Sequence, residues 1–194
     1  MNEQLFHIIN NFAGRFDWID DLMEIFAQDI VWLMLAILVF LWCSGSKENQ
    51  RAVFFACLTA AVSLLLAAWV ISPLVNHPRP FVDHTVHQLI SHAADASFPS
   101  DHATLAFSFA FVILLMKRQT GVLMLVFAVL TGISRIYVGV HYPADILGAV
   151  VLSFLIALTV FALRKQIDPI SRLFISLYNQ ILRVIPVLSR FSKS

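Results

Sequence analysis

An uncharged run of 24 residues, from Ala52 to Val75, limits this chain more than any other feature of its sequence. At about 1.5 Å per residue, a helix of this length covers the roughly 30 Å hydrocarbon core of a bilayer. Composition agrees, because 59% of the 194 residues are hydrophobic and 13% are charged, whereas about 25% are charged in a typical soluble domain. The run predicts a membrane-spanning helix and therefore an integral membrane protein.

Four further apolar segments are shorter than the first or contain charged residues. They are Leu22–Trp42, Ala103–Met116, Gly121–Val138 and Ala144–Leu163. The Ala103 segment has 14 residues, about 21 Å of helix, so it spans only if the residues just before it sit below the membrane surface. We predict an all-α, polytopic membrane helix bundle with five spans, formed by a single domain of residues 1–194 whose core is 52–163.

The distribution of Lys and Arg gives these spans a direction, because such residues accumulate on the cytoplasmic side of short loops. With residues 44–51, residues 117–121 and everything after Leu163 inside, ten of the thirteen positive charges are cytoplasmic. The exceptions are Arg15, Arg79 and Arg135. A six-span alternative takes residues 169–191 through the bilayer and exports basic residues, so five spans are preferred.

Both ends of the chain predict amphipathic helices on the membrane surface. Apolar residues recur at helical spacing near the N-terminus: Leu5, Ile8, Ile9 and Phe12. The first 29 residues lack a basic start and are rich in acidic residues, so no cleavable signal peptide is expected. At the other end, Asp168 and Pro169 suggest the N-cap and first turn of a helix over about 168–190 on the inner leaflet.

Three short motifs place ionisable groups at the ends of the apolar segments. They are Pro78-Arg79-Pro80, Pro99-Ser100-Asp101-His102, and Ser134-Arg135 followed by His141 and Asp145. The predicted topology brings all three to the outer face, although whole spans separate them in sequence. Insertion scales put an Arg or Asp at mid-membrane at about 2.5–3.5 kcal/mol, so groups kept near the bilayer are functional candidates.

Ser100 predicts an N-cap immediately before the Ala103 segment. The free N–H groups of a helix N-terminus bind phosphate, since those donors and the positive end of the dipole face the same point. His102, in the first turn, could reach a group bound there. A plain capping sequence is the alternative, and it would be preferred if this motif stood alone.

Pro143 fits the first position of the last helix, so Asp145 in the first turn can reach back to His141. A carboxylate on one ring nitrogen fixes the tautomer and leaves the other nitrogen free as a nucleophile. For an isolated His-x3-Asp pair, a structural hydrogen bond is the simpler explanation. Arg135 reverses that preference, because a guanidinium beside the pair at the membrane boundary is suited to an anion.

The order Arg-Pro, Pro-Ser-x-His and Ser-Arg-x5-His-x3-Asp resembles the type 2 phosphatidic acid phosphatase superfamily of metal-independent membrane phosphatases. Within it, residues 84–87 and 92–102 are similar to the bacitracin-resistance type of undecaprenyl-diphosphatase. Ser72 stands where the superfamily usually has a lysine, and Asp101 stands where it usually has a glycine. Both departures favour this subgroup over general lipid phosphatases, although Asp101 adds negative charge where a phosphate would bind.

The resemblance implies that His141, oriented by Asp145, attacks phosphorus and forms a phosphohistidine. It implies that His102 protonates the leaving oxygen and then activates water. The substrate phosphate would lie among Arg79, Ser100, Asp101 and Arg135. Further possible members of the site are Ser134, His77 and Asp95. Neither a cofactor nor a metal is implied.

The implied substrate is a polyprenyl diphosphate, hydrolysed on the extracytoplasmic face of a bacterial plasma membrane to recycle the carrier lipid of the cell wall and confer bacitracin resistance. No nucleic-acid partner is expected. Phosphatidylglycerophosphate or diacylglycerol diphosphate remains an alternative substrate, and a lipid-phosphate binding or flipping protein is the alternative from another class. The outer-loop residues His84, His87 and His92 match no metal signature in their spacing, so roles in loop packing are preferred.

Overall fold

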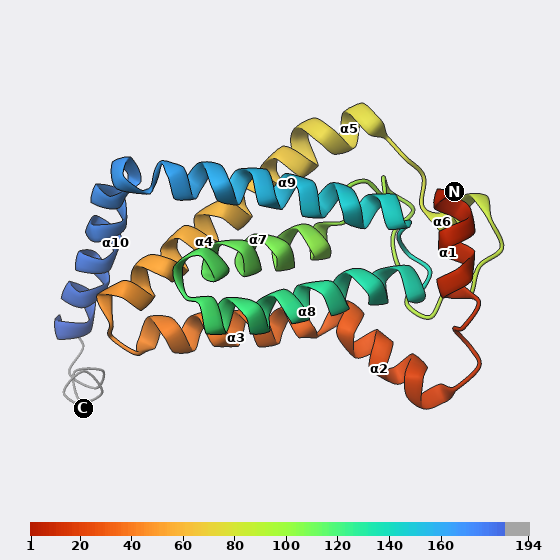
Figure 1. The fold of residues 1–194 in the computed structure, drawn as a ribbon, viewed down its shortest axis with the longest axis horizontal. Helices are drawn as coiled ribbons and strands as arrows, with labels where there is room; N and C mark the ends of the chain where they lie inside the picture. Colours follow the sequence, from red (N-terminus) through yellow and green to blue (C-terminus); the bar gives the residue numbers. More distant parts are fainter. Residues whose placement is uncertain (185–194) are drawn as a thin grey trace.

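The computed structural model, which describes residues 1–184, is a bundle of helices with a helix lying across each end (Figure 1). The helices are α1 (Asn2–Asn10), α2 (Asp17–Gln28), α3 (Ile30–Cys43), α4 (Lys47–Leu66), the π-helical turn η1 (Ala67–Ile71), α5 (Ser72–Val75), α6 (Pro80–Asp83), α7 (Asp101–Met116), α8 (Arg118–Tyr137), α9 (Pro143–Ala162) and α10 (Arg164–Val184). The predicted all-α fold is confirmed.

Helix α7 lies at the centre of the bundle, where it packs against α8, α9 and α4. Small and polar residues make this close packing possible, as is common between membrane helices. The Ser108 hydroxyl donates to the Ser153 hydroxyl at 3.2 Å, and that hydroxyl donates to the Thr104 carbonyl at 2.9 Å. On α9, a Cβ added to Gly148 would lie 2.3 Å from the Phe98 ring. The glycine therefore lets the loop before α7 sit directly on α9.

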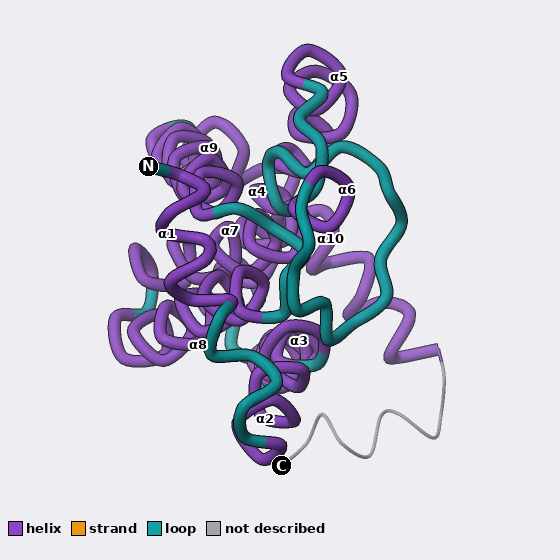
Figure 2. Tube along the Cα trace, turned by 90° about the vertical axis from the view of Figure 1, so that its right-hand side faces the viewer, coloured by secondary structure: helices purple, strands orange, loops and turns teal. Residues whose placement is uncertain are grey.

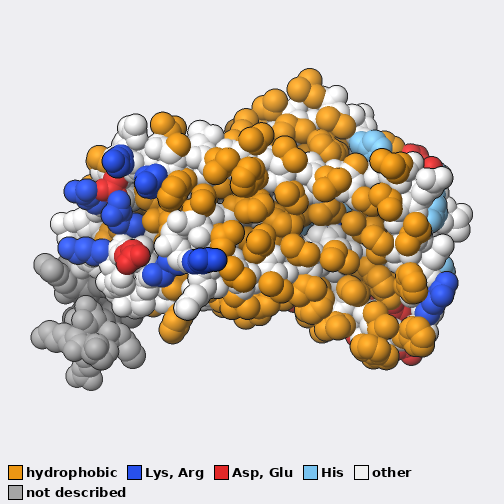
Figure 3. Space-filling model, viewed as in Figure 1, with side chains coloured by type: hydrophobic (Ala, Val, Ile, Leu, Met, Phe, Trp, Pro, Cys, Tyr) orange, Lys and Arg blue, Asp and Glu red, His pale blue; other side chains and the backbone are white. Residues whose placement is uncertain are grey.

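Three helical segments are long and apolar enough to cross a membrane: residues 47–83, α8 and α9. The pair α2 and α3 adds a fourth when it is taken as one bent span, and α7 is a shorter apolar helix. These elements correspond to the five predicted spans. Figure 3 shows the outcome on the surface, since hydrophobic side chains cover the middle of the molecule and Lys and Arg gather at the α10 end.

The most N-terminal of the predicted spans, Leu22–Trp42, is not one straight helix. It is divided at Asp29 into α2 and α3, which are bent by 48°. The amphipathic, acidic part of the sequence lies in α2, which packs on α8. There the buried Asp20 carboxylate accepts hydrogen bonds from the Tyr137 hydroxyl at 2.7 Å and the Gly14 amide at 3.0 Å. These tertiary bonds direct α2 away from the axis of the wholly apolar α3.

The N-terminal helix α1 is amphipathic, as predicted, and three of the four residues of its expected stripe are exposed. It is also anchored to the bundle by two buried residues, Phe6 and Asn10. The Asn10 amide donates to the carbonyls of His87 and Tyr137 at 2.8 Å each, and its oxygen accepts from the His87 amide. Asn10 thus ties the long loop 84–99 to the end of α8.

The C-terminal helix begins at Arg164, earlier than predicted, and Pro169 lies inside it. Asp168 is therefore not an N-cap. Its buried carboxylate lies 2.5 Å from both Arg51 of α4 and Arg172 of α10. The ion pair with Arg51, which local sequence does not reveal, joins α10 to α4. The predicted amphipathic character is confirmed by an exposed apolar stripe, and residues 185–190 of the predicted helix lie outside the described part of the chain. The stripe consists of Ile170, Leu173, Phe174, Leu177 and Ile181.

Candidate active site

The three motifs meet at the end of the bundle where α7 begins, beneath the long loops that cross this end in Figure 2. Arg79 directly precedes α6, and Ser100 caps α7. Arg135 is in the last turn of α8, His141 lies between α8 and α9, and Asp145 is in the first turn of α9. The connection between α8 and α9 is short, so these last three residues are placed by two adjacent helix ends.

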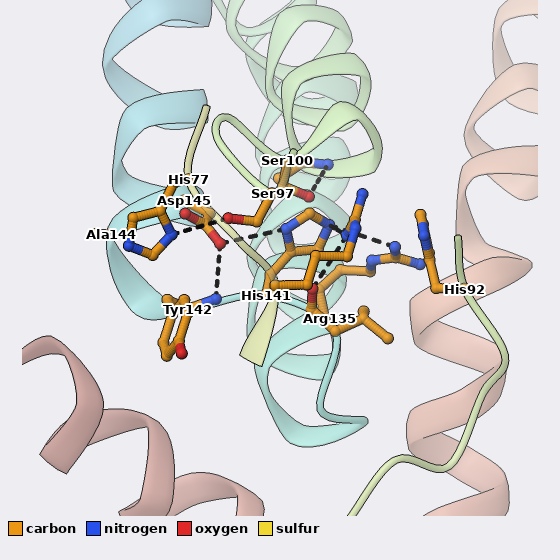
Figure 4. A network of polar contacts seen from close by, with 12 residues as sticks. His77, His92, Ser97, Ser100, Arg135, His141, Tyr142, Ala144 and Asp145 are labelled. Atoms are coloured by element: carbon orange, nitrogen blue, oxygen red, sulfur yellow. Dashed lines mark hydrogen bonds and ion pairs between the residues drawn. The ribbon is translucent and has the colours of Figure 1, made fainter. Parts of the chain in front are cut away.

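His141 and Asp145 form a buried pair, each about 1% exposed. The His141 Nδ1 atom lies 3.4 Å from Asp145 Oδ2, which also accepts a hydrogen bond from the Tyr142 amide at 2.8 Å (Figure 4). Burial and the two nearby arginines hold the pKa of the His141 imidazole well below its ordinary value. Burial and these charges therefore favour the neutral form of the imidazole.

Two guanidinium groups converge on the other ring nitrogen of His141. Arg79 Nη1 lies 3.1 Å from His141 Nε2 and donates to the Val140 carbonyl, while Arg135 Nη2 lies 3.4 Å from the same nitrogen. Guanidinium groups only donate hydrogen bonds. Nε2 must therefore be the acceptor, which puts the ring proton on Nδ1, facing Asp145. This is the tautomer in which Nε2 keeps its lone pair.

The arginines carry more positive charge than their surroundings neutralise. Arg79 is 3% exposed and Arg135 is 1% exposed. Within residues 1–184, Arg79 has one carboxylate partner, Asp95, and Arg135 has none. Arg135 instead donates to the Ala27 carbonyl at 3.4 Å, and its buried Nε has no partner in that part of the chain. Buried charge of this kind is costly unless a ligand is bound to it.

The start of α7 borders this charge. Ser100 is buried, and its hydroxyl accepts a long hydrogen bond of 3.5 Å from the Ala103 amide, as expected of an N-cap. The Ser100 amide donates to the Asp145 carbonyl at 3.3 Å, which fixes α7 against α9. The N–H groups that follow Ser100 are those left free by helix geometry.

His102 and Asp101 lie in the first turn of α7. Both line a groove of about 210 Å³ formed between α3, α4 and α7. The remaining lining residues are mostly apolar: Gln28, Val31, Trp32, Leu35, Leu64 and Leu105. Among the described residues, His102 has no hydrogen bond to the His141 cluster, and the apolar lining of the groove lies beside it.

The three weaker candidates take different positions. Ser134 is buried, and its hydroxyl donates to the Thr131 carbonyl within α8, so it does not face the arginines. His77 lies 3.1 Å from the Ser97 hydroxyl, behind Asp145 (Figure 4). Asp95 accepts a hydrogen bond of 2.8 Å from Arg79 Nε.

The outer-loop histidines do not gather into one cluster. His84 lies 3.5 Å from Glu3, while His92 has its ring 6.2 Å from the His141 ring. Within residues 1–184, no group of three or more His, Cys, Asp or Glu side chains is arranged to hold a metal. The sequence did not single out Asn10, whose only local signal is a polar residue on the buried side of α1.

Comparison with known proteins identifies the class of this chain. Residues 52–168 match the PAP2 superfamily. The chain belongs to this superfamily, as the motifs predicted, and it is a membrane-embedded phosphatase.

Particular relatives are more informative still. Over 182 residues, 94% of each chain, the sequence is 35% identical to the undecaprenyl-diphosphatase BcrC of Bacillus subtilis. It is 38% identical over 149 residues to the putative undecaprenyl-diphosphatase YbjG of Escherichia coli, covering 76% of this chain and 75% of that protein. Among solved structures, LpxE of Aquifex aeolicus is 25% identical with a TM-score of 0.67, covering 83% of this chain and 94% of that one.

Proposed function

We propose that this protein hydrolyses undecaprenyl diphosphate to undecaprenyl phosphate and inorganic phosphate. The observation that carries the chemistry is the convergence of two buried guanidinium groups on His141 Nε2. Phosphoryl transfer requires mainly positioning and electrostatic stabilisation, which such an arrangement supplies. The substrate is supported by the similarity to BcrC and YbjG.

In the proposed reaction, His141 Nε2 attacks the terminal phosphorus while Asp145 stabilises the ring proton on Nδ1. A P–N bond forms and the bond from phosphorus to the bridging oxygen breaks. His102 gives a proton to that oxygen, so undecaprenyl phosphate leaves. His102 then takes a proton from water, the resulting hydroxide attacks phosphorus, and cleavage of the P–N bond releases phosphate.

The oxygens of the transferring phosphoryl group would be bound by Arg79, Arg135 and Ser100, together with free N–H groups at the start of α7. Charge develops on these oxygens in the transition state, and donors already in place stabilise it without reorganisation. Because the guanidinium groups supply the positive charge, the proposed mechanism uses no metal ion.

The groove beside His102 supports a lipid substrate. Its lining is mostly apolar, and Trp32 at its rim is 69% exposed. We place the first isoprene units there, with the diphosphate directed toward His141. His102 then borders the oxygen that remains with the lipid, which is where a leaving-group proton is required.

We propose further that the active site faces the extracytoplasmic side of a bacterial plasma membrane. The basic residues at the α10 end support this orientation, since positive charge accumulates on the cytoplasmic side. In that position the enzyme would regenerate the carrier lipid of cell-wall synthesis, and a high level of it would confer resistance to bacitracin.

A substrate panel with the purified protein tests the proposal. Phosphate release is measured with undecaprenyl diphosphate, phosphatidylglycerophosphate and diacylglycerol diphosphate, and His141→Ala serves as the inactive control. We expect the highest kcat/KM with undecaprenyl diphosphate. A higher value with either glycerolipid would overturn the assigned substrate, and lipid disappearance without phosphate release would replace hydrolysis by binding or flipping.

A further inference from the structure

Asp95 contacts a different nitrogen of Arg79 from the one that faces His141. Its Oδ1 atom accepts a hydrogen bond of 2.8 Å from Arg79 Nε, whereas Arg79 Nη1 faces His141 Nε2 and the Val140 carbonyl. The carboxylate therefore uses the Nε edge of the guanidinium. The hydrogen bonds of Arg79 within the described residues leave Nη2 for a ligand.

These contacts fix the orientation of a planar group. A guanidinium held at Nε by a carboxylate and at Nη1 by a carbonyl cannot turn about its terminal bonds without breaking a charge-assisted hydrogen bond. Arg135 lacks such a carboxylate in the described part of the chain and is held by the Ala27 carbonyl at the longer distance of 3.4 Å. The two phosphate-facing arginines are thus held by different means.

Asp95 and Arg79 differ in exposure. Its side chain is 61% exposed, while that of Arg79 is 4% exposed. Asp95 itself therefore remains solvated, while the buried Arg79 loses its one carboxylate partner among residues 1–184 in an Asp95 variant, which costs stability as well as orientation. A positioning role is therefore tested by kcat per folded molecule, a quantity that a loss of stability alone does not change.

We infer that Asp95 is a positioning residue, which keeps the Arg79 guanidinium directed at His141 Nε2 and at the phosphate that His141 attacks. This inference rests on the proposed function, because it needs Arg79 to bind the transferring phosphoryl group. It assigns the Asp95 carboxylate to the Nε atom of Arg79, which leaves Arg79 Nη2 for the substrate.

The long loop 84–99 is the element that supplies this carboxylate. His92 Nδ1 lies 3.8 Å from the same Asp95 oxygen, and the His92 ring is 6.2 Å from the His141 ring. The Asn10 bonds to His87 fix the same loop against α8. Asp95, a loop residue outside the three motifs, therefore sets the geometry of one motif arginine.

The test compares Asp95→Ala, Asp95→Asn and the parent enzyme on the best lipid substrate of the panel. The asparagine keeps an acceptor for Arg79 Nε, whereas alanine removes it. We expect Asp95→Ala to lower kcat by about 10–100-fold with a smaller change in KM, since an interaction aimed at the transition state is lost. Asp95→Asn should recover most of kcat. The matched control is Asp21→Ala, an exposed carboxylate of α2 at the same end of the bundle, which should leave kcat and KM unchanged.

A double-mutant cycle shows whether Asp95 acts through Arg79. In an Arg79→Gln background, Asp95→Ala should cause little further loss, because coupled residues are not additive. An equal loss in both backgrounds would overturn the inference, and so would tighter substrate binding by Asp95→Ala, which would mark Asp95 as a competitor of the phosphate.

Orthovanadate binding provides a readout that does not depend on the lipid. Vanadate adopts the geometry of a transferring phosphoryl group, and analogues of a transition state bind more tightly than substrates. Calorimetry should find weaker vanadate binding by Asp95→Ala and near-parent binding by Asp95→Asn. Unchanged binding by both variants would overturn the inference, even if the lipid substrate differed from the one proposed.

Discussion

The two ends of the bundle use the same residue types with their burial reversed. At the site, Arg79 and Arg135 are buried, and the carboxylate of Asp95 is exposed. At the other end, the carboxylate of Asp168 is buried, and the side chains of Arg51 and Arg172 are 40% and 76% exposed. One end therefore retains buried positive charge, while the other buries negative charge that two arginines neutralise.

The reversed burial indicates that the charged residues at one end serve to bind an anion and those at the other end serve to hold helices together. Guanidinium groups that lack enough carboxylates can stabilise an incoming anion, and the protein holds them in position at a cost in stability. At the α10 end, both Asp168 oxygens are used by arginines of α4 and α10. The Asp168 carboxylate therefore joins α4 to α10 and has little hydrogen-bonding capacity left for a ligand. The predictions below test this division of roles.

The largest effect is expected at the nucleophile. His141→Ala should reduce hydrolysis by about 10⁴-fold or more, because the atom that attacks phosphorus is removed. Substrate binding should survive, since both arginines remain. Phosphate release under single-turnover conditions and lipid binding measure the two properties. Activity within tenfold of the parent would exclude His141 as the nucleophile.

A pair of matched arginine variants compares the two ends directly. Arg135→Gln should lower kcat by about 10²–10³-fold, as expected when a transition-state donor is lost. Arg172→Gln, which removes the same charge at the α10 end, should leave kcat within about twofold, because Arg172 lies at the other end of the bundle from His141 and Arg51 still pairs with Asp168. Steady-state kinetics on both proteins decides the matter, and similar losses in the two would refute the division of roles.

The stabilising role of Asp168 predicts an effect on folding without one on chemistry. Burial opposes its charged form, but Arg172 and Arg51 outweigh burial and hold the Asp168 pKa below its usual range. A lowered pKa in the folded state means that the contribution is present above the ordinary carboxyl pKa and lost as pH falls through the folded value. Asp168→Asn should therefore lower Tm near neutral pH by about 2–4 °C.

Thermal unfolding of the parent and of Asp168→Asn over a pH series provides the measurement. The difference in Tm should shrink toward acid pH, while kcat per folded molecule stays the same. A difference that is constant across pH would show that the Asp168 charge contributes nothing to stability.

The smallest effect is expected from metal removal. EDTA should leave activity largely intact, because guanidinium groups and a helix N-terminus supply the positive charge. The assay is phosphate release before and after chelation. Loss of activity that one added divalent ion restores would give the loop histidines a catalytic role.

The sequence predicted those features that depend on position along a helix. Ser100 precedes an apolar segment and Pro143 begins another, so their helix starts and the nearness of Asp145 to His141 follow from local rules. The predicted topology placed Arg79 at the same end of the bundle as Ser100 and His141, because an even number of predicted membrane crossings separates the three motifs. Local order and topology thus sufficed to assemble most of the candidate site.

Contacts between distant residues were beyond sequence reasoning. Asp168 resembles an N-cap until Arg51 is seen beside it, and Asp29 reads as part of a span until Asp20 is found bonded to Tyr137. The acceptor for Arg79 Nε could have been any carboxylate of the outer loops. In each case a polar side chain is paired through the fold, and no period or spacing records its partner.

The contacts of His141 Nε2 also affect how the enzyme without substrate reacts with other reagents. A lone pair that accepts from two cationic donors is a poor base and a poor ligand. The imidazole therefore reacts weakly with protons, divalent cations and small electrophiles. In the proposed reaction, the oxygens of a bound phosphate would accept the N–H groups of Arg79 and Arg135 in place of His141 Nε2, without the guanidinium groups having to turn. The anion that His141 is proposed to attack would thereby free the lone pair of the attacking nitrogen.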